Sequence, residues 1–219
     1  MSAKRPLTED ELAAAAARTI EHYQSSAKSF ADATRDHDVS QNYAALLGAI
    51  EAAPPLRILD FGCGPGRDLA YFSSLGHEAV GLDGTRAFVE MARAATGCEV
   101  LHQSFFALSL PPARFDGVFA NASLLHVPAQ SLASVLGALY DTLVPGGAFF
   151  CSNPRGPDTE GWSGDRYSAF YSLETWRTHV TAVGFVELDH YYRPPGKPRD
   201  QQPWLATVWR KPRPNIAAT

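Results

Sequence analysis

Hydrophobic positions in the first fifty residues recur at intervals of three and four, the spacing of one helix face. Residues 9–23 predict the first helix, which is rich in Ala, Leu and Glu. The polar serine pair at 25–26 predicts a break, and a second helical segment is expected around Phe30. A further helix is expected over about 40–52, so the amino-terminal region is predicted to be helical throughout.

Beyond residue 55, short apolar runs alternate with amphipathic stretches, a rhythm typical of α/β proteins. The predicted strands are 56–61, 79–82, 99–102, 117–120, 148–152, 185–191 and 205–210, and the predicted helices are 68–75, 85–95, 130–143 and 173–183. A loop rich in Gly, Pro and Asp is expected over 153–172. We predict a mostly parallel sheet with helices on both faces, with the last two strands forming an antiparallel hairpin at its edge.

The composition fits one globular domain, since 45% of the 219 residues are hydrophobic and 19% are charged. Within this domain we expect a helical cap over 1–53, a core over 54–211 and a short tail over 212–219. The formal net charge of −4 argues against nucleic acid as a partner. No run reaches the roughly 18 apolar residues that a membrane-spanning helix needs, so no membrane partner is expected.

Three cysteines, Cys63, Cys98 and Cys151, show no CxxC spacing. Together with the absence of a recognisable signal peptide, this pattern predicts reduced thiols and a cytoplasmic enzyme. We expect no metal site, because the sequence contains no matching set of ligands. The oligomeric state stays open.

The strongest chemical signal is a glycine loop directly after the first predicted strand. Gly62, Gly64 and Gly66 follow Asp60, and Asp83 ends the next predicted strand. Glycines in this place let the backbone approach a ligand closely. The Asp83 carboxylate can then accept hydrogen bonds from both ribose hydroxyls of a nucleotide, although a helix cap is the alternative.

The glycine spacing separates two kinds of nucleotide site. A dinucleotide fingerprint is GxGxxG, whereas this loop has GxGxG with an acid just before its first glycine. That acid, Asp60, would repel a phosphate but suits a cationic amine, such as the one on S-adenosylmethionine. The pattern therefore favours S-adenosylmethionine over a nicotinamide cofactor.

Asp60–Gly66 together with Asp83 resembles the class I S-adenosylmethionine-dependent methyltransferases, and the strand pattern extends the resemblance over 56–210. The resemblance implies a Rossmann-like sheet of seven strands with the last strand antiparallel. It also implies a set of cofactor-binding residues: Asp60, Gly62, Gly64, Gly66, Asp83, Gly84, Ser104, Phe105, Asn121 and Ala122. Ser104 stands where many members of the family have an acid that contacts adenine.

Segments after the fourth and fifth strands are expected to line the acceptor site, because ligands lie at the carboxyl ends of strands in such sheets. The segment 121–128 follows the fourth strand, and 153–156 follows the fifth. The latter contains Asn-Pro-Arg-Gly, whereas nucleic-acid amine methyltransferases often carry Asn-Pro-Pro-Tyr or Asp-Pro-Pro-Tyr after the fourth strand. This difference also disfavours a nucleic-acid substrate.

A narrower resemblance rests on four segments: 34–42, 121–128, 153–162 and 190–210. Together they are similar to the methyltransferase domain that is fused to the sulfoxide synthase of ovothiol biosynthesis, and to its free-standing bacterial counterparts. The resemblance implies methylation of the imidazole π nitrogen of 5-thiohistidine, with ovothiol A as product. Insertion of sulfur would then require a separate sulfoxide synthase as pathway partner.

Methyl transfer to imidazole needs an acceptor lone pair in line with the sulfonium methyl group, about 3 Å away. It also needs the tautomer with its proton on the far nitrogen, held by a protein acceptor. Candidates for that contact are Asn121, Asp36, Asp38 and His37. Aromatic faces that can cover the sulfonium are Tyr23, Phe30 and Tyr167.

An amino-acid substrate needs a cation for its carboxylate, and Arg155 or Arg166 can provide it. Asn153 and His126 are further candidates for substrate contact. The other interpretations are a solvated turn at 36–38, a packed histidine at His126 and an ion pair for Arg155. At the level of function, the alternatives are another small carboxylated amine or heteroaromatic acceptor, and a cofactor-binding partner subunit without activity.

Overall fold

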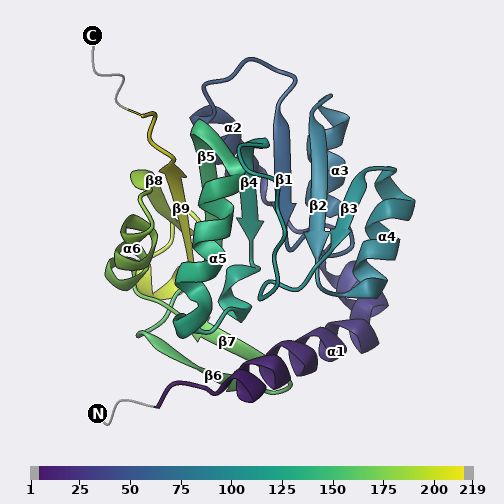
Figure 1. Cartoon of the computed structure of the whole chain (residues 1–219), viewed down its shortest axis with the longest axis vertical. Coiled ribbons are helices and arrows are strands. Elements are labelled where there is room, and N and C mark those ends of the chain that lie inside the picture. Colours follow the sequence, from purple (N-terminus) through teal and green to yellow (C-terminus); the bar gives the residue numbers. More distant parts are fainter. Residues whose placement is uncertain (1–4, 215–219) are drawn as a thin grey trace.

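The computed structural model describes residues 5–214, in which a central sheet carries helices on both faces (Figure 1). The strands of this sheet are β1 (Arg57–Phe61), β2 (Glu78–Asp83), β3 (Glu99–His102), β4 (Phe115–Asn121), β5 (Leu143–Pro154), β8 (Val186–Arg193) and β9 (Trp204–Arg210). The helices are α1 (Glu9–Thr34), α2 (Ser40–Ala49), α3 (Arg67–Ser74), α4 (Arg86–Thr96), α5 (Ala129–Thr142) and α6 (Leu173–Ala182), with 3-10 turns η1 (Leu124–His126) and η2 (Arg199–Gln201).

The seven strands run in the order β3-β2-β1-β4-β5-β9-β8. All pairs from β3 to β5 are parallel, whereas β9 is antiparallel to both of its neighbours. The predicted α/β class, with an antiparallel last strand and helices on both faces, is confirmed. The carboxyl ends of β1, β2 and β4 consequently meet at one edge of the sheet, where the glycine loop begins.

Each face of the sheet has its own hydrophobic core. On one face, α5 and α6 contribute Leu132, Leu136 and Trp176 to a cluster with the aromatic side chains of the strands. On the other face, α2, α3 and α4 bury Leu46, Phe72 and Val89, among others, against the sheet. The sheet is therefore covered by helices along most of its width, which leaves the carboxyl edge as the place for a ligand.

The predicted break at residues 25–26 is wrong, because α1 continues from Glu9 to Thr34. The hydroxyls of Ser25 and Ser26 both donate to the carbonyl of His22, so their polar groups are satisfied inside the helix. A capping box of Thr8 and Glu11 begins the helix. In Figure 1, α1 runs along the lower end of the molecule, beneath the carboxyl edge of the sheet.

The predicted loop over 153–172 contains a β-hairpin of β6 (Thr159–Ser163) and β7 (Arg166–Phe170). The hairpin packs on α1, where the Thr19 hydroxyl accepts a hydrogen bond from the Tyr167 amide at 3.0 Å. An ion pair of 2.7 Å between Arg18 and Asp165 lies beside this contact. The helix and the hairpin thus form one cap over the carboxyl edge.

The end of the predicted tail, 215–219, lies outside the described residues. Among residues 5–214 there is no helix with the length and apolar character needed to cross a membrane.

Candidate active site

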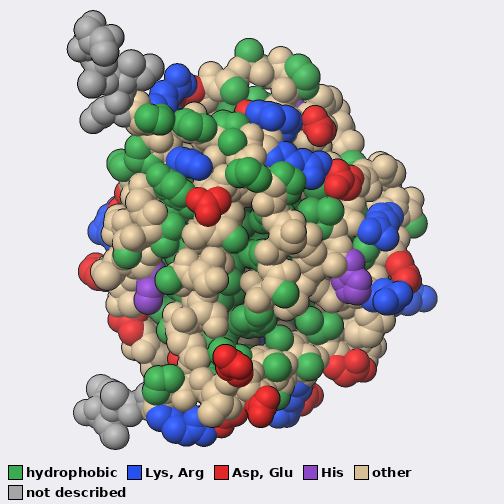
Figure 2. All heavy atoms as spheres, viewed as in Figure 1, with side chains coloured by type: hydrophobic (Ala, Val, Ile, Leu, Met, Phe, Trp, Pro, Cys, Tyr) green, Lys and Arg blue, Asp and Glu red, His purple; other side chains and the backbone are tan. Residues whose placement is uncertain are grey.

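A cavity of about 920 Å³ lies between the carboxyl edge of the sheet and the cap. Its walls come from the loops that follow β1, β2, β3 and β4, from α1 and β7, and from the end of β8. Acidic and basic side chains are interspersed over the face of the molecule shown in Figure 2, without a large block of one sign. A cavity of this kind suits a cofactor together with a small molecule.

The three glycines of the loop serve three different purposes. A Cβ at Gly62 would lie 2.3 Å from the Cβ of Ser123, so only glycine fits there. At Gly64 (φ 52°), the nearest atom to such a Cβ belongs to the Phe30 side chain at 3.9 Å, so this backbone is open toward the cavity. Gly66 lies outside the cavity wall and instead lets α4 approach closely at Ala92.

Asp83 lies on the cavity wall at the end of β2 and is 8% exposed. Its carboxylate accepts hydrogen bonds from the amides of Gly64 (3.0 Å) and Thr85 (2.7 Å). Neither amide belongs to the first turn of α4, which begins at Arg86, so Asp83 does not cap that turn. Burial raises the pKa of this carboxyl, and the two amides partly offset the shift.

Asp60 is buried behind the glycine loop and does not itself line the cavity. Its Oδ2 atom has no hydrogen-bond partner within the described chain. Burial, followed by the nearby charge of Asp68, raises its pKa well above the usual value. This acid stands behind the loop where the cationic amine of S-adenosylmethionine would bind, and it does not reach that amine directly.

The predicted adenine side of the cofactor site comes together around the ends of β2 and β3. Gly84, Ser104, Phe105 and Ala122 all line the cavity. The Phe105 ring stacks on Phe61 with centroids 4.3 Å apart, which fixes its position. The structure thus gathers the residues that would hold an adenosine group, and the Asp83 carboxylate lies at the same end.

Tyr23 and Phe30 project from α1 into the cavity, with their ring centroids 5.4 Å apart. The Tyr23 hydroxyl lies 2.9 Å from His126 Nε2, and Arg166 donates to the same hydroxyl at 3.2 Å. His126 Nδ1 lies 2.8 Å from the carbonyl of Tyr167 and must donate to it, so Nε2 accepts from Tyr23. Burial lowers the pKa of His126 to about 4, which keeps the ring neutral.

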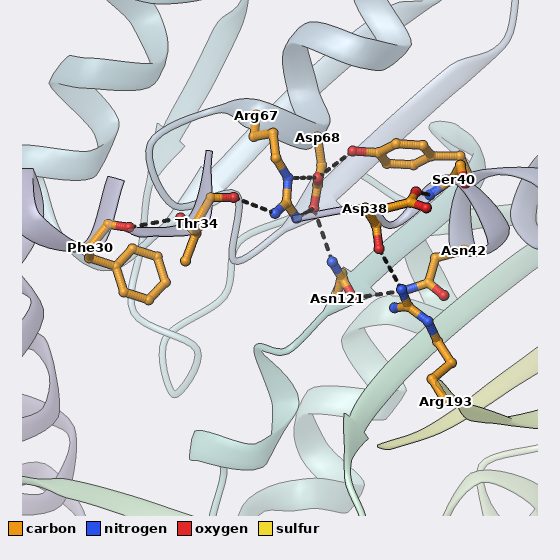
Figure 3. A network of polar contacts seen from close by, with 10 residues as sticks. Phe30, Thr34, Asp38, Ser40, Asn42, Arg67, Asp68, Asn121 and Arg193 are labelled. Atoms are coloured by element: carbon orange, nitrogen blue, oxygen red, sulfur yellow. Dashed lines mark hydrogen bonds and ion pairs between the residues drawn. The ribbon is translucent and has the colours of Figure 1, made fainter. Parts of the chain in front are cut away.

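Asn121 lies at the centre of a polar network (Figure 3). Its Oδ1 accepts from Asn42 at 3.1 Å, and its Nδ2 donates to Asp68 at 3.2 Å. Asp68 in turn pairs with Arg67 at 2.7 Å and accepts from the hydroxyl of Tyr43 at 2.6 Å. Asn121 lines the cavity, but its amide is held by protein partners on both sides.

The segment between α1 and α2 contributes His37 and Asp38 to the cavity wall. The Asp38 carboxylate accepts from the amide of Ser40 at 2.9 Å. Asp36, which the sequence placed among the candidates for the imidazole contact, is exposed and lies outside the wall. The structure therefore brings two of the three residues of this turn to the site.

Several other candidates do not reach the cavity. Arg155 donates to the carbonyls of Gln202 (2.7 Å) and Arg199, which holds its side chain near η2. Asn153 donates to the sulfur of Cys151 at 3.2 Å. The ring of Tyr167 packs against Trp162, and only its backbone contacts His126. Arg166, in contrast, lines the cavity.

Arg193, Phe170 and Trp204 also line the cavity, although they were absent from the predicted site. Arg193 and Trp204 lie in the segment 190–210 that carried the narrower resemblance, which was the available signal. Phe170 belongs to the unexpected hairpin, so no strand had been predicted that would place it.

Residues 58–147 match a family model described as a methyltransferase domain. Among solved structures, 1,6-didemethyltoxoflavin-N1-methyltransferase of Burkholderia thailandensis, with bound 1,6-didemethyltoxoflavin and S-adenosylhomocysteine, aligns with a TM-score of 0.75 and 23% identity over 96% of this chain and 93% of that one. An S-adenosylmethionine-dependent methyltransferase from Mesorhizobium loti aligns with a TM-score of 0.64 and 21% identity, over 77% and 97%.

Similar sequences are named for different acceptors. A 24-methylenesterol C-methyltransferase 2 of Oryza sativa subsp. japonica is 32% identical over 56% of this chain, and a malonyl-[acyl-carrier protein] O-methyltransferase of Enterobacter lignolyticus is 30% identical over 65%. These matches span 34% and 53% of the relatives' own lengths. Residues 58–147 thus match the methyltransferase-domain model, and the chain has the fold of the class I S-adenosylmethionine-dependent methyltransferases.

Proposed function

We propose that this protein is an S-adenosylmethionine-dependent N-methyltransferase that methylates the imidazole π nitrogen of 5-thiohistidine to give ovothiol A. The observation that carries the proposal is the shape of the cavity. One end holds the open glycine loop and Asp83, and the other end has polar and aromatic walls from segments that lie mostly outside residues 58–147. All four segments with the narrower resemblance, 34–42, 121–128, 153–162 and 190–210, contribute residues to the cavity lining.

Different residues at the cofactor end would interact with different parts of the cofactor. Asp83 would accept hydrogen bonds from the ribose hydroxyls, and the buried carboxyl of Asp60 would face the cationic amine through the glycine loop. Tyr23 and Phe30 present aromatic faces to the same space. The bound cofactor supplies an electrophilic methyl group, and these side chains only position it.

At the acceptor end the protein needs to orient an imidazole rather than deprotonate it. A neutral imidazole is already a nucleophile near pH 7, so positioning supplies most of the catalysis. Asn121 Oδ1 already accepts from Asn42 and has one lone pair left, so it is a weaker candidate for the imidazole proton than a free acceptor. Asp38 and His37 remain on the wall as acceptors for the proton of the far nitrogen.

The structure from Burkholderia supports a ring nitrogen as the acceptor atom, because that protein is named as an N1-methyltransferase and has 1,6-didemethyltoxoflavin and S-adenosylhomocysteine bound. The C- and O-methyltransferases among the relatives share only part of their length with this chain. The acceptor is therefore proposed from the walls of the cavity and not from the shared domain.

The test is a mass-spectrometric assay of the purified protein with S-adenosylmethionine and reduced 5-thiohistidine, with histidine as control. We expect a product heavier by one methylene group from 5-thiohistidine alone, and fragmentation should locate the methyl group on the ring. Turnover of a different carboxylated amine or heteroaromatic acceptor would show that the protein is a methyltransferase with another substrate than 5-thiohistidine. Cofactor binding without turnover of any acceptor would instead indicate a partner subunit.

A further inference from the structure

Three arginines of the described chain line the cavity, and they differ in what holds their charge. Arg67 is paired with the carboxylate of Asp68 at 2.7 Å. Arg166 donates to the hydroxyl of Tyr23, beside the aromatic rings that face the glycine loop. Neither Arg166 nor Arg193 has an ion pair with a carboxylate within residues 5–214, and Arg193 lies away from Tyr23.

The position of Arg193 is fixed at both ends of its side chain. Its backbone ends β8, in register with Trp204 of β9. Its Nη2 donates to the carbonyl of Asp38 at 2.6 Å, so the guanidinium is tied to the turn between α1 and α2. The Nε atom is buried without a partner, and Nη1 makes no hydrogen bond to the described chain. The guanidinium of Arg193 therefore keeps an N–H donor, on Nη1, that no group of the described chain accepts.

Arg193 lies at the acceptor end of the cavity. Figure 3 shows Asn121 between the Arg67–Asp68 pair and Arg193. The prolines that follow Arg193 and the ring of Trp204 line the same end. A planar cation among rigid apolar groups is a common arrangement for recognition of a carboxylate.

We infer that Arg193 binds the carboxylate of the acceptor, a role that rests on the proposed function. The imidazole would then lie between this anchor and the glycine loop, beside Asn121. Arg166 would contact the acceptor only near Tyr23, and Arg155, which donates to backbone carbonyls outside the cavity, takes no part. The free Nη1 is the donor that a carboxylate in the cavity can satisfy, whereas Nε is buried out of its reach.

Arg193 is assigned to the carboxylate of the substrate and not to its imidazole, so two ligands that differ only in the carboxylate test this assignment. Isothermal titration calorimetry of the protein saturated with S-adenosylhomocysteine compares reduced 5-thiohistidine with its decarboxylated analogue, 5-thiohistamine. In the wild type the carboxylate should tighten binding about 10- to 100-fold, the range of a charge-assisted hydrogen bond. In Arg193→Gln the two ligands should bind equally well.

Three further variants complete the experiment. Arg166→Gln should keep the preference for the carboxylate, and Arg199→Gln, on the exposed turn η2, should leave both affinities unchanged. Arg193→Lys keeps the charge but loses the planar geometry, so it should keep part of the preference for the carboxylate. This variant also provides the test if Arg193→Gln does not fold. Melting temperature and affinity for S-adenosylhomocysteine report on folding and on the cofactor site.

Each result has a distinct meaning. A preference for 5-thiohistidine that survives in Arg193→Gln, or one that disappears only in Arg166→Gln, would overturn the assignment of Arg193. If the wild type binds S-adenosylhomocysteine but neither probe, the proposed acceptor is wrong and the inference fails with it. The loss of preference in Arg193→Gln alone, with unchanged cofactor affinity, supports both.

Discussion

The two ends of the cavity are built in different ways. The cofactor end comes from consecutive strand–loop units of the methyltransferase domain, with Gly62 after β1 and Asp83 after β2. The acceptor end comes mainly from segments that are far apart in the chain: the turn at 37–39, the hairpin β6–β7 and the end of β8. The sheet and its loops determine the cofactor end, whereas the acceptor end depends on how the turn between α1 and α2, the hairpin and β8 pack against the sheet.

This contrast explains why one domain serves many acceptors. The relatives of residues 58–147 are named for carbon and oxygen acceptors, and a structural neighbour is named for a nitrogen acceptor. Changes in the cap alter the acceptor wall without altering the glycine loop. Mutations at the two ends should therefore affect different ligands, and the following predictions test that separation.

The largest effect is expected at Gly62. Gly62→Ala places a Cβ 2.3 Å from Ser123 Cβ at a φ of 76°, so the loop must move. We expect a loss of about 2–5 kcal/mol in the free energy of unfolding and no detectable cofactor binding. Urea unfolding and calorimetry measure both. Gly137→Ala in α5, where nothing lies within 4 Å, is the control and should be neutral or stabilising.

Asp83→Ala should act mainly on the cofactor site, together with some loss of stability, because the buried amides of Gly64 and Thr85 lose their acceptor. Removing the carboxylate leaves the ribose hydroxyls without acceptors, so the affinity for S-adenosylhomocysteine should fall about 10- to 100-fold, or 1–3 kcal/mol. Calorimetric titration measures it, with Asp200→Ala on the exposed turn η2 as the control. Unchanged cofactor affinity in Asp83→Ala would refute the assignment to ribose.

His126 should make the protein sensitive to acid. Its pKa of about 4 in the folded state lies below the ordinary value of 6.5, so the unfolded chain binds more protons between these values. The stabilising contribution is complete above pH 6.5 and is lost as the pH falls. Between about pH 7.5 and pH 5, the wild type should lose about 2 kcal/mol more than His126→Gln, as measured by urea unfolding. Parallel losses in the two proteins would contradict the neutral, buried ring.

The smallest effect is expected for Arg155→Ala. This side chain donates to the backbone near η2 and does not line the cavity, so neither the cofactor affinity nor the KM of the acceptor should change by more than about twofold. Arg166→Ala, made in parallel, should raise the acceptor KM. An increase in KM for Arg155→Ala as large as that for Arg166→Ala would show that the acceptor end extends beyond the cavity described above.

The cofactor end was predictable because its signals are local. The apolar run of β1, the glycines and the acid at the end of β2 lie within about thirty residues, and the strand–helix rhythm places them at one edge. The role of Gly66 was not predictable, since its need for glycine comes from the approach of Ala92 on another helix. Sequence spacing cannot distinguish contact with a ligand from contact between helices.

The acceptor end was predicted less well because its geometry is tertiary. The hairpin β6–β7 has five-residue strands with a glycine in β6, and it depends on packing against Thr19 and Arg18 of α1. Arg155 and Arg166 are equally good candidates in the sequence, yet hydrogen bonds to distant carbonyls hold one of them outside the cavity. Which arginine faces a ligand is decided by such contacts and not by residue type.

The proposed reaction is methyl transfer to a ring nitrogen of 5-thiohistidine, and it is tested most directly with S-adenosylmethionine that carries a carbon-13-labelled methyl group. After incubation with reduced 5-thiohistidine, heteronuclear NMR of the product identifies the atom that carries the label. We predict a single labelled methyl group, coupled to the imidazole ring at the π nitrogen. Label on the α-amine, on sulfur or on the other ring nitrogen would contradict it, as would no transfer by a protein that binds S-adenosylhomocysteine.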